Sequence, residues 1–503
     1  MKTIIRTIDQ NNIEKAAIQE AGRILQEGGL VAFPTETVYG LGADALNEEA
    51  AVKTYEAKGR PSDNPLIVHI AEFSALPKIV EEIPPLAEAL AEHFWPGPLT
   101  MIFKKRAVVP YGTTGGLDTV AVRMPENLIA RELILAAGGY ISAPSANVSG
   151  RPSPTTAEHV YTDLNGRISM ILDGGSVEIG LESTILDMTV TPPMILRPGA
   201  ITREMLATVL PYVAVDPSIH GEDRDTAPKA PGMKYRHYAP KAELIIVDGP
   251  AKLAVKAIRQ IAYEHVSKGE VPGIIGTTET VGRYTHGIIK SIGTRNSEKS
   301  IARNLYAILR AFDEEGVSVI YSESFAAEGM GDAIMNRLEK AAGHHRVSAE
   351  EIVRMQKYHQ IMFLSESDTS RGPMAAEILR NQTLNREYDI ISRGLIVLFP
   401  EPVNQKAEAI MASHKLSMAS YQSKMFDPDE IEADTLVLAM NMSQKQKVMS
   451  ECGIEENIYT LSEFVQEEEQ IGHPIGQPLS EYGKCFETIE RLIKKLTQKL
   501  NEL

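Results

Sequence analysis

The chain contains few cysteines and no long apolar run. Its 503 residues include only Cys452 and Cys485, which form no disulfide framework and no multi-cysteine metal site. This scarcity is typical of a reducing compartment. No segment approaches the roughly 18–20 uninterrupted apolar residues that a membrane span needs, and the N-terminus, MKTIIRTIDQNN, has only a short apolar cluster. We therefore expect a cytoplasmic protein that is neither secreted nor membrane-inserted.

The chain also lacks a basic excess and a standard phosphate loop. Its formal net charge is -16 and aromatic residues make up 6%. Non-specific nucleic-acid binding relies on a basic surface that releases counterions, so strong direct binding is not expected. The pattern GxxxxGK[ST] is absent, and GLGADA does not complete GxGxxG. A nucleotide would have to be held by side chains at a non-standard site.

The length predicts about three domains of roughly 100–200 residues, and the pattern indicates a multidomain α/β protein. Residues 1–212 alternate helical segments with short apolar strands and predict a mixed α/β domain. Polar sequence with proline and glycine at 213–240 predicts a linker or lid. Residues 241–347 and 358–503 both read strand, helix, strand, which predicts two parallel α/β layers.

Two neighbouring motifs near the N-terminus carry the densest chemistry. In FPTETVYGLGADA, Thr35 follows an apolar strand and precedes Gly40 and Gly42, which would let backbone approach a ligand closely; a structural turn explains the same pattern. In KGRPSDNPLIVHI, Lys58 and Arg60 alternate with polar residues before a strand. Such alternation points side chains to one face, where two cations could hold a polyphosphate.

Further polar side chains recur at the ends of later strands. Singly, each serine or threonine is more often a cap or turn residue than a ligand. The candidates are Thr119, Arg123, Ser145, Asn147, Ser153, Ser183 and Arg197.

Seven motifs in order resemble the threonylcarbamoyl-adenylate synthase family, the YrdC/Sua5 group. They span most of residues 10–205 and read PTETVYGLG, KGRPSDNPLIVHI, FWPGPLT, TVAVRMP, APSANVSGRPSPT, GLESTILD and LRPGAI. The following PGMKYRHYAPKAELI is similar to the longer Sua5 form, whose second domain, Rossmann-like, would then occupy about 241–347.

The resemblance implies a nucleotidyltransferase that makes threonylcarbamoyl-AMP and pyrophosphate from L-threonine, bicarbonate and ATP. The product would pass to the tRNA threonylcarbamoyl transferase machinery for t6A37 modification. By position, the implied threonine-binding residues are Thr35, His69, Arg123, Ala143 and Ser183. The implied ATP-binding residues are Arg60, Asn64, Thr119, Ser145, Ser153 and Arg197, with Lys58 beside the phosphates and Lys58 and Arg60 as catalytic residues.

Magnesium is expected with the triphosphate, held through substrate oxygens, and no protein ligand for it is assigned. Tyr235, Arg236, His237 and Tyr238 could form a lid that shields the adenylate from water, or an ordered linker without substrate contact. Residues 241–347 offer no nucleophile–base pair, so we expect this domain to gate or brace the first.

Residues 360–503 resemble a low-molecular-weight protein tyrosine phosphatase with a degenerate loop. The family's loop, Cys-x-Gly-Asn-x-Cys-Arg-Ser-Pro, reads SESDTSRGP here, so Ser365 replaces the nucleophile, Asp368 the asparagine, and only Arg371 and Pro373 remain. Serine is far less acidic than cysteine and needs an adjacent base. Glu366 and Asp368 would oppose a bound dianion, and the late acid aligns with His473.

We therefore predict an inactive phosphatase-like domain. Two alternatives stay open, namely a bifunctional synthase with residual phosphatase activity and a module that binds tRNA or other RNA. The role of the third domain and the oligomeric state cannot be read from the sequence.

Overall fold

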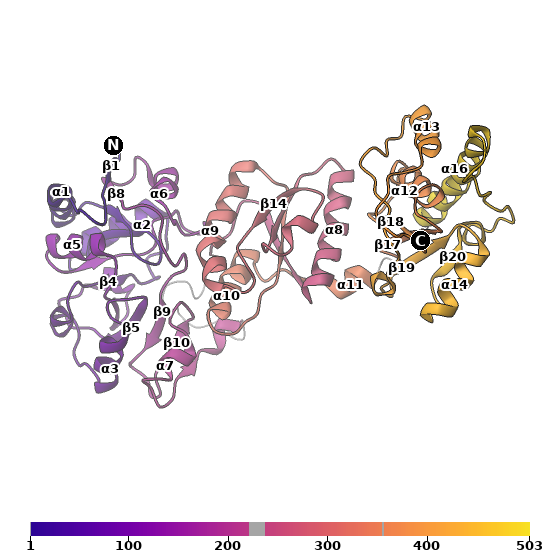
Figure 1. Ribbon diagram of the computed structural model, residues 1–503. Helices are drawn as coiled ribbons and strands as arrows, with labels where there is room; N and C mark the ends of the chain where they lie inside the picture. Colours follow the sequence, from indigo (N-terminus) through magenta and orange to yellow (C-terminus); the bar gives the residue numbers. More distant parts are fainter. Residues whose placement is uncertain (1, 221–236, 355–356, 503) are drawn as a thin grey trace. The chain divides into compact units, whose positions relative to one another are not determined.

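The computed structural model describes residues 2–220, 237–354 and 357–502. The chain divides into two compact units (Figure 1). The first comprises Met1–Ala251 with Glu270–Val347, and the second comprises Lys252–Gly269 with Ser348–Leu503. The predicted domain boundaries stay predictions, but this division groups the helix that follows the first strand of the middle region with the third region.

The first unit is built on a mixed sheet of eleven strands, whose order is β1-β8-β2-β3-β7-β4-β6-β5-β9-β10-β11. Most of these strands are short and buried, as expected for apolar runs of three to six residues. The strands in this order are β1 (Ile4–Thr7), β8 (Met170–Asp173), β2 (Val31–Phe33), β3 (Gly40–Asp44), β7 (Ile141–Ser142), β4 (Ile67–His69), β6 (Thr119–Arg123), β5 (Leu99–Lys104), β9 (Thr184–Asp187), β10 (Met194–Arg197) and β11 (Ala214–Val215).

Four helices of this region, α2, α5, α6 and α7, have a side-chain N-cap. In α2, the Asn47 side chain accepts the backbone N–H groups of residues 49 and 50, and Gly59 ends the helix in the left-handed conformation with φ 61°. The cap therefore places Lys58 and Arg60 at the end of a buried helix. The helices are α1 (Lys15–Gln26), α2 (Glu48–Lys58), α3 (Pro85–Phe94), α4 (Tyr111–Thr114), α5 (Leu128–Ala136), α6 (Ala157–Leu164) and α7 (Arg203–Leu206), with 3-10 turns η1 (Phe73–Lys78) and η2 (Pro217–His220).

A second sheet of the first unit follows the order β14-β13-β15-β12-β16, with β12, β15, β13 and β14 in parallel pairs. Its helices share one apolar core with the N-terminal region, since Leu305 and Leu309 lie in the same buried cluster as Val38 and Leu181. The elements are β12 (Glu243–Asp248), β13 (Pro272–Gly276), η3 (Val281–Arg283), β14 (Ile288–Ser291), α9 (Glu298–Glu315), β15 (Val319–Glu323), α10 (Met330–Ala342) and β16 (Arg346–Ser348).

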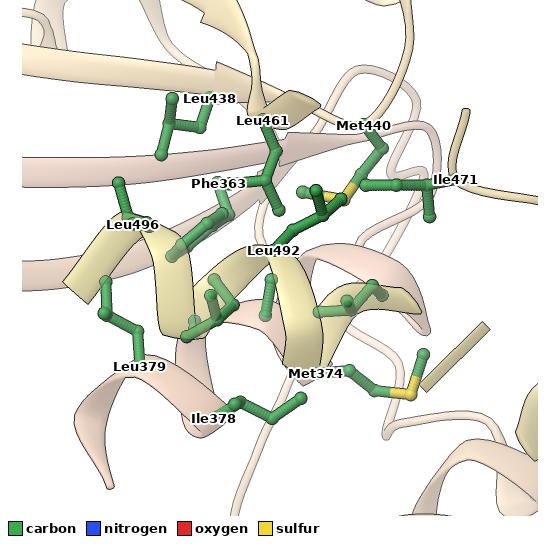
Figure 2. Packing of buried hydrophobic residues seen from close by; sticks show 14 of the residues in the cluster. Phe363, Met374, Ile378, Leu379, Leu438, Met440, Leu461, Ile471, Leu492 and Leu496 are labelled. Carbon is green, nitrogen blue, oxygen red and sulfur yellow. The ribbon is translucent and has the colours of Figure 1, made fainter. Parts of the chain in front are cut away.

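The second unit holds a parallel sheet of four strands in the order β18-β17-β19-β20. Apolar side chains of the sheet and of two helices, α12 and α16, interlock in its core, where Phe363 lies close to Leu492 and Leu496 (Figure 2). The elements are α8 (Ala251–Ser267), α11 (Ala349–Arg354), β17 (Gln360–Ser365), α12 (Arg371–Arg380), β18 (Asp389–Gly394), α13 (Gln405–Ser413), η4 (Pro428–Glu430), β19 (Thr435–Ala439), α14 (Met442–Cys452), β20 (Ile458–Thr460), α15 (Leu461–Phe464) and α16 (Leu479–Glu502).

The α/β class, the mixed first sheet and the parallel later sheets confirm the sequence predictions. Gly40 and Gly42 lie within strand β3, and Gly40 lines the pocket described below, so the expected close approach of backbone to a ligand stays a prediction. A Cβ at Gly42 would meet the Val31 carbonyl oxygen at 3.0 Å, so close packing of β3 on β2 requires a glycine there. Among the described residues, no helix is long and apolar enough to cross a membrane.

We predict that Leu492→Ala lowers the unfolding free energy of the third region by about 2–5 kcal/mol, because it leaves a cavity in a fully buried cluster. Hydrogen exchange of the amides in β17 and α12 measures this loss. Leu479→Ala, on the same helix but 48% exposed, is the control and leaves exchange nearly unchanged. Equal exchange in both variants would contradict the packing described here.

Candidate active site

One pocket of the first unit collects side chains from distant segments. It lies where β4, β6 and β7 end and where the loop before β9 crosses the sheet. The sequence-predicted residues that line it are Thr35, Lys58, Arg60, His69, Arg123, Ala143, Ser145, Asn147, Ser183, Arg197, His237 and Tyr238.

Two cations of the KGRPSDN motif occupy one side of the pocket. The Lys58 ammonium is buried and donates to the backbone carbonyls of Ser145 and Asn147, the latter at 2.5 Å. Burial lowers the pKa of Lys58 well below its ordinary value, and nearby Arg60 lowers it further. The Arg60 guanidinium donates to Asn64 Oδ1 at 2.5 Å and to the Pro65 carbonyl at 3.1 Å. This side of the pocket can therefore attract an anionic group.

On the opposite side, polar groups are fixed by their own hydrogen bonds. Arg123 donates to Glu36 Oε1 at 2.5 Å and to Thr37 Oγ1 at 2.9 Å, in a buried ion pair. Thr35 Oγ1 lies 2.8 Å from Thr37 Oγ1. His69 Nδ1 lies 3.0 Å from the Ile67 carbonyl, and burial, with help from Arg123, lowers the pKa of His69 to about 3. Because His69 is neutral and the charge of Arg123 is balanced by Glu36, this part of the pocket suits a zwitterion such as an amino acid better than a second anion.

A serine and an arginine join the two sides. Arg197, at the end of β10, donates to the Ser183 carbonyl at 3.1 Å and to its Oγ at 3.2 Å. Thr100 Oγ1 lies 2.7 Å from the same hydroxyl. Burial lowers the pKa of Arg197. Ser183 therefore lies between the guanidinium side and the threonine-rich side.

The lid prediction falls partly on described residues. Tyr235 and Arg236 lie outside them, whereas His237 and Tyr238 line the pocket. Burial, followed by the charge of Arg60, lowers the pKa of His237 to about 3. Tyr238 has a positive φ of 65° and stacks on Tyr306 with ring centroids 5.2 Å apart. The segment after the linker thus covers one wall of the pocket.

Three predicted ATP residues are not among the lining residues. Asn64 orients Arg60, and Ser153 donates to Glu182 Oε1 at 2.5 Å. Both residues therefore contact a residue that lines the pocket without lining it themselves. Thr119 begins β6, and Arg123 ends it. At about 3.3 Å per strand residue, Thr119 lies roughly 13 Å along the strand from Arg123. Their assignment to ATP stays a prediction.

The loop of the third region has the geometry of an anion cradle with altered chemistry. Ser365 ends β17, Arg371 begins α12, and both are buried. Asp368 has a positive φ of 54°. Its Oδ2 accepts the Tyr421 hydroxyl and, at 3.0 Å, the Lys424 N–H. Burial raises the pKa of Asp368 despite these hydrogen bonds.

The expectation that two carboxylates oppose a bound dianion at this loop stays a prediction. One oxygen of Asp368 is held by the surrounding scaffold, as described above. Glu366 is exposed, and its Oε2 lies 3.3 Å from His473 Nε2 at the protein surface. Among the described residues, no base accepts a hydrogen bond from the Ser365 hydroxyl. The Ser365 hydroxyl therefore has no base beside it in the described part of the chain.

Family models cover most of the chain. A model described as Telomere recombination, of the Sua5, YciO and YrdC group, matches residues 23–199. The C-terminal domain of threonylcarbamoyl-AMP synthase matches 201–343, and low molecular weight phosphotyrosine protein phosphatase matches 360–503. The fold and pocket thus belong to a carbamoyl-adenylate-forming class with a phosphatase-like domain appended.

Relatives narrow the class to one family. The chain is 49% identical over 342 residues to threonylcarbamoyl-AMP synthase of Pyrococcus abyssi, covering 68% of this chain and 98% of that protein. It is 47% identical to the Bacillus subtilis enzyme, covering 68% and 99%. A structure of P. abyssi Sua5 with L-threonine superposes with a TM-score of 0.66 at 47% identity, covering 69% and 99%. The chain belongs to the threonylcarbamoyl-AMP synthase family, in its long Sua5 form.

Two carboxylates of the pocket region were not among the predicted site residues. Glu36 pairs with Arg123, and Glu182 lines the pocket beside Ser183. Each lies within a recognised motif, PTETVYGLG or GLESTILD. The sequence signal that could have identified them is a charged residue inside an otherwise apolar or hydroxylated segment, because a charge is costly to bury unless it is paired.

The depressed pKa of His69 predicts a pH dependence of stability. Below about pH 6.5 the unfolded chain binds a proton on this histidine that the folded protein rejects, so stability falls by up to about 1.4 kcal/mol per pH unit down to about pH 3. His69→Gln removes this loss. Urea unfolding at pH 7 and pH 5 should show a smaller drop in the variant than in the wild type, and equal drops would contradict a neutral buried His69.

Proposed function

We propose that residues 1–347 form threonylcarbamoyl-AMP from L-threonine, bicarbonate and ATP, as a nucleotidyltransferase, and that the adenylate is used for t6A modification of tRNA. The observation that carries this is one pocket lined by the cationic side chains Lys58, Arg60 and Arg197 together with the neutral imidazole of His69 and hydroxyl groups. The solved complex of P. abyssi Sua5 with L-threonine supports threonine as the ligand that binds near the imidazole and hydroxyl groups. A cytoplasmic location is proposed from the tRNA substrate.

The reaction needs positioning and charge neutralisation more than proton transfer. The threonine amine and bicarbonate give a carbamate with loss of water. A carbamate oxygen then attacks the α-phosphate of ATP, the new P–O bond forms, and the bond to pyrophosphate breaks. Charge develops on the phosphoryl oxygens, where fixed cations stabilise it most. We assign this role to Lys58, Arg60 and Arg197, whose orientations are set by neighbouring carbonyl and amide groups.

Magnesium is proposed to accompany the triphosphate. Within the described ranges, no group of three or more histidine, cysteine, aspartate or glutamate side chains is placed to hold an ion. The buried carboxylates near the pocket, Glu36 and Glu182, are already paired with arginines. The donor set therefore suits an ion carried by phosphate oxygens and water, which magnesium prefers. Bound magnesium would supply further neutralisation of the triphosphate charge.

The decisive experiment supplies the full-length protein with ATP, threonine and labelled bicarbonate and looks for threonylcarbamoyl adenylate. We expect Arg60→Ala or Arg197→Ala to lower its formation by at least about 100-fold, because charge-assisted contacts to phosphate are lost in a buried site. Circular dichroism should show a folded chain. The control is Arg6→Ala, which removes an exposed ion pair with Glu20 and leaves turnover unchanged. Wild-type-like turnover in either pocket variant would remove the phosphate-site assignment.

We also propose that residues 360–503 are a pseudophosphatase. Full-length protein is expected to show no hydrolysis of an aryl phosphate, because Ser365 has no base partner and its hydroxyl is not acidic enough to ionise near neutral pH. Steady-state assays with p-nitrophenyl phosphate measure this. The control is Ser365→Ala, which should match the wild type, and hydrolysis that disappears in this variant would establish the bifunctional alternative.

A further inference from the structure

Glu182 is a buried carboxylate at the pocket wall whose partners come mostly from helices outside the N-terminal region. Its Oε2 accepts the Tyr306 hydroxyl at 2.8 Å and the Arg337 Nε at 3.2 Å. Tyr306 lies on α9 and Arg337 on α10. The other oxygen, Oε1, accepts the Ser153 hydroxyl. Three segments that are distant in sequence therefore meet on one carboxylate.

Arg337 balances the charge of this carboxylate. Its side chain is fully buried and is the largest such side chain among the described residues, and Asn336 Oδ1 accepts a hydrogen bond from it at 3.1 Å. Burial alone would raise the pKa of Glu182, but the charges of Arg337 and Arg197 outweigh it and lower the pKa. Glu182 is therefore a buried anion in direct contact with Arg337, and the positive charge of Arg197 further favours its ionised form.

The charge balance of Glu182 affects how the pocket would bind an anionic ligand. Without Arg337, the carboxylate would draw on Arg197 for its charge partner and would also repel a triphosphate at the same wall. Tyr306 adds a second link, because its hydroxyl donates to Glu182 while its ring stacks on Tyr238 at an interplanar angle of 28°. The same side chain thus connects the carboxylate with the segment that covers the pocket.

We infer that Arg337 and Tyr306 are positioning residues for the ATP side of the pocket, and that they act through Glu182. Neither residue lines the pocket. The inference extends the proposed function and rests on it. It assigns the region around the second sheet of the first unit a role in ATP binding. That region keeps Arg197 available to phosphate and holds Tyr238 in place.

The first test measures ATP binding by calorimetry and adenylate formation by steady-state kinetics in full-length protein. Arg337→Met keeps the side-chain volume and removes the charge. We expect its Kd and KM for ATP to rise by about tenfold or more, with the KM for threonine changed less than threefold. The double variant Glu182→Gln with Arg337→Met should return to within about threefold of the wild type, because no unpaired anion remains. A purely structural role for Arg337 would show no such rescue.

The matched control is Arg295→Met, which removes the arginine partner of another buried carboxylate, Glu323, away from the pocket. It should lower the melting temperature but leave ATP binding unchanged. Should Arg337→Met fail to fold, Tyr306→Phe keeps the ring and loses only the hydroxyl. We expect it to weaken ATP binding on the order of tenfold, because a hydrogen bond to a charged group is lost.

The results separate this inference from the proposed function. Wild-type protein that binds ATP but makes no threonine-dependent product would overturn the proposed function and leave the binding test valid. Unchanged ATP binding in Arg337→Met or, where that variant does not fold, in Tyr306→Phe would overturn the inference. A double variant that binds ATP no better than Arg337→Met would also overturn it, even when the wild type forms the adenylate.

Discussion

The buried carboxylate of Glu182 is the constraint on which the first compact unit depends. An ionised carboxylate is tolerated away from water only when its charge is matched and its oxygens accept hydrogen bonds. Arg337 matches the charge, and hydroxyl groups of Ser153 and Tyr306 complete the set. Because these groups come from separate segments, the pocket wall beside Ser183 reaches this state only when the N-terminal region and helices α9 and α10 fold together. The apolar cluster that both regions share has the same consequence.

The sequence was informative where chemistry follows a local pattern. Strands β4 to β6 and the cations Lys58 and Arg60 could be predicted, because apolar alternation and motif spacing are local properties. The Glu182–Arg337 pair could not be predicted, since its members lie 155 residues apart and each resembles an ordinary surface charge. The packing role of Gly42 could not be predicted for a related reason: a glycine that strand packing favours and a glycine that admits a ligand look alike until the neighbouring strand is known.

In the third region, the apolar core and the loop from Ser365 to Arg371 use different side chains. Its stability rests on apolar packing between the sheet and α16, where Phe363 and Leu492 are fully buried, and this packing does not use the loop from Ser365 to Arg371. Replacing the nucleophile therefore costs little stability. The loop contains a left-handed residue, Asp368, whose Oδ2 accepts hydrogen bonds from Tyr421 and a backbone N–H. Fold and activity are separable here because they depend on different side chains.

Charge, and not only apolar contact, ties α8 to the phosphatase-like domain within the second unit. Lys256 donates to Glu432 and Asp434, and Arg259 to Glu387 and Asp389. Lys256, Arg259, Glu387 and Asp434 are partly buried whereas Glu432 and Asp389 are exposed, so the pairs remain sensitive to salt. Helix α8 follows β12 and precedes β13 in the chain. These ion pairs therefore hold α8 against the phosphatase-like domain within the second unit.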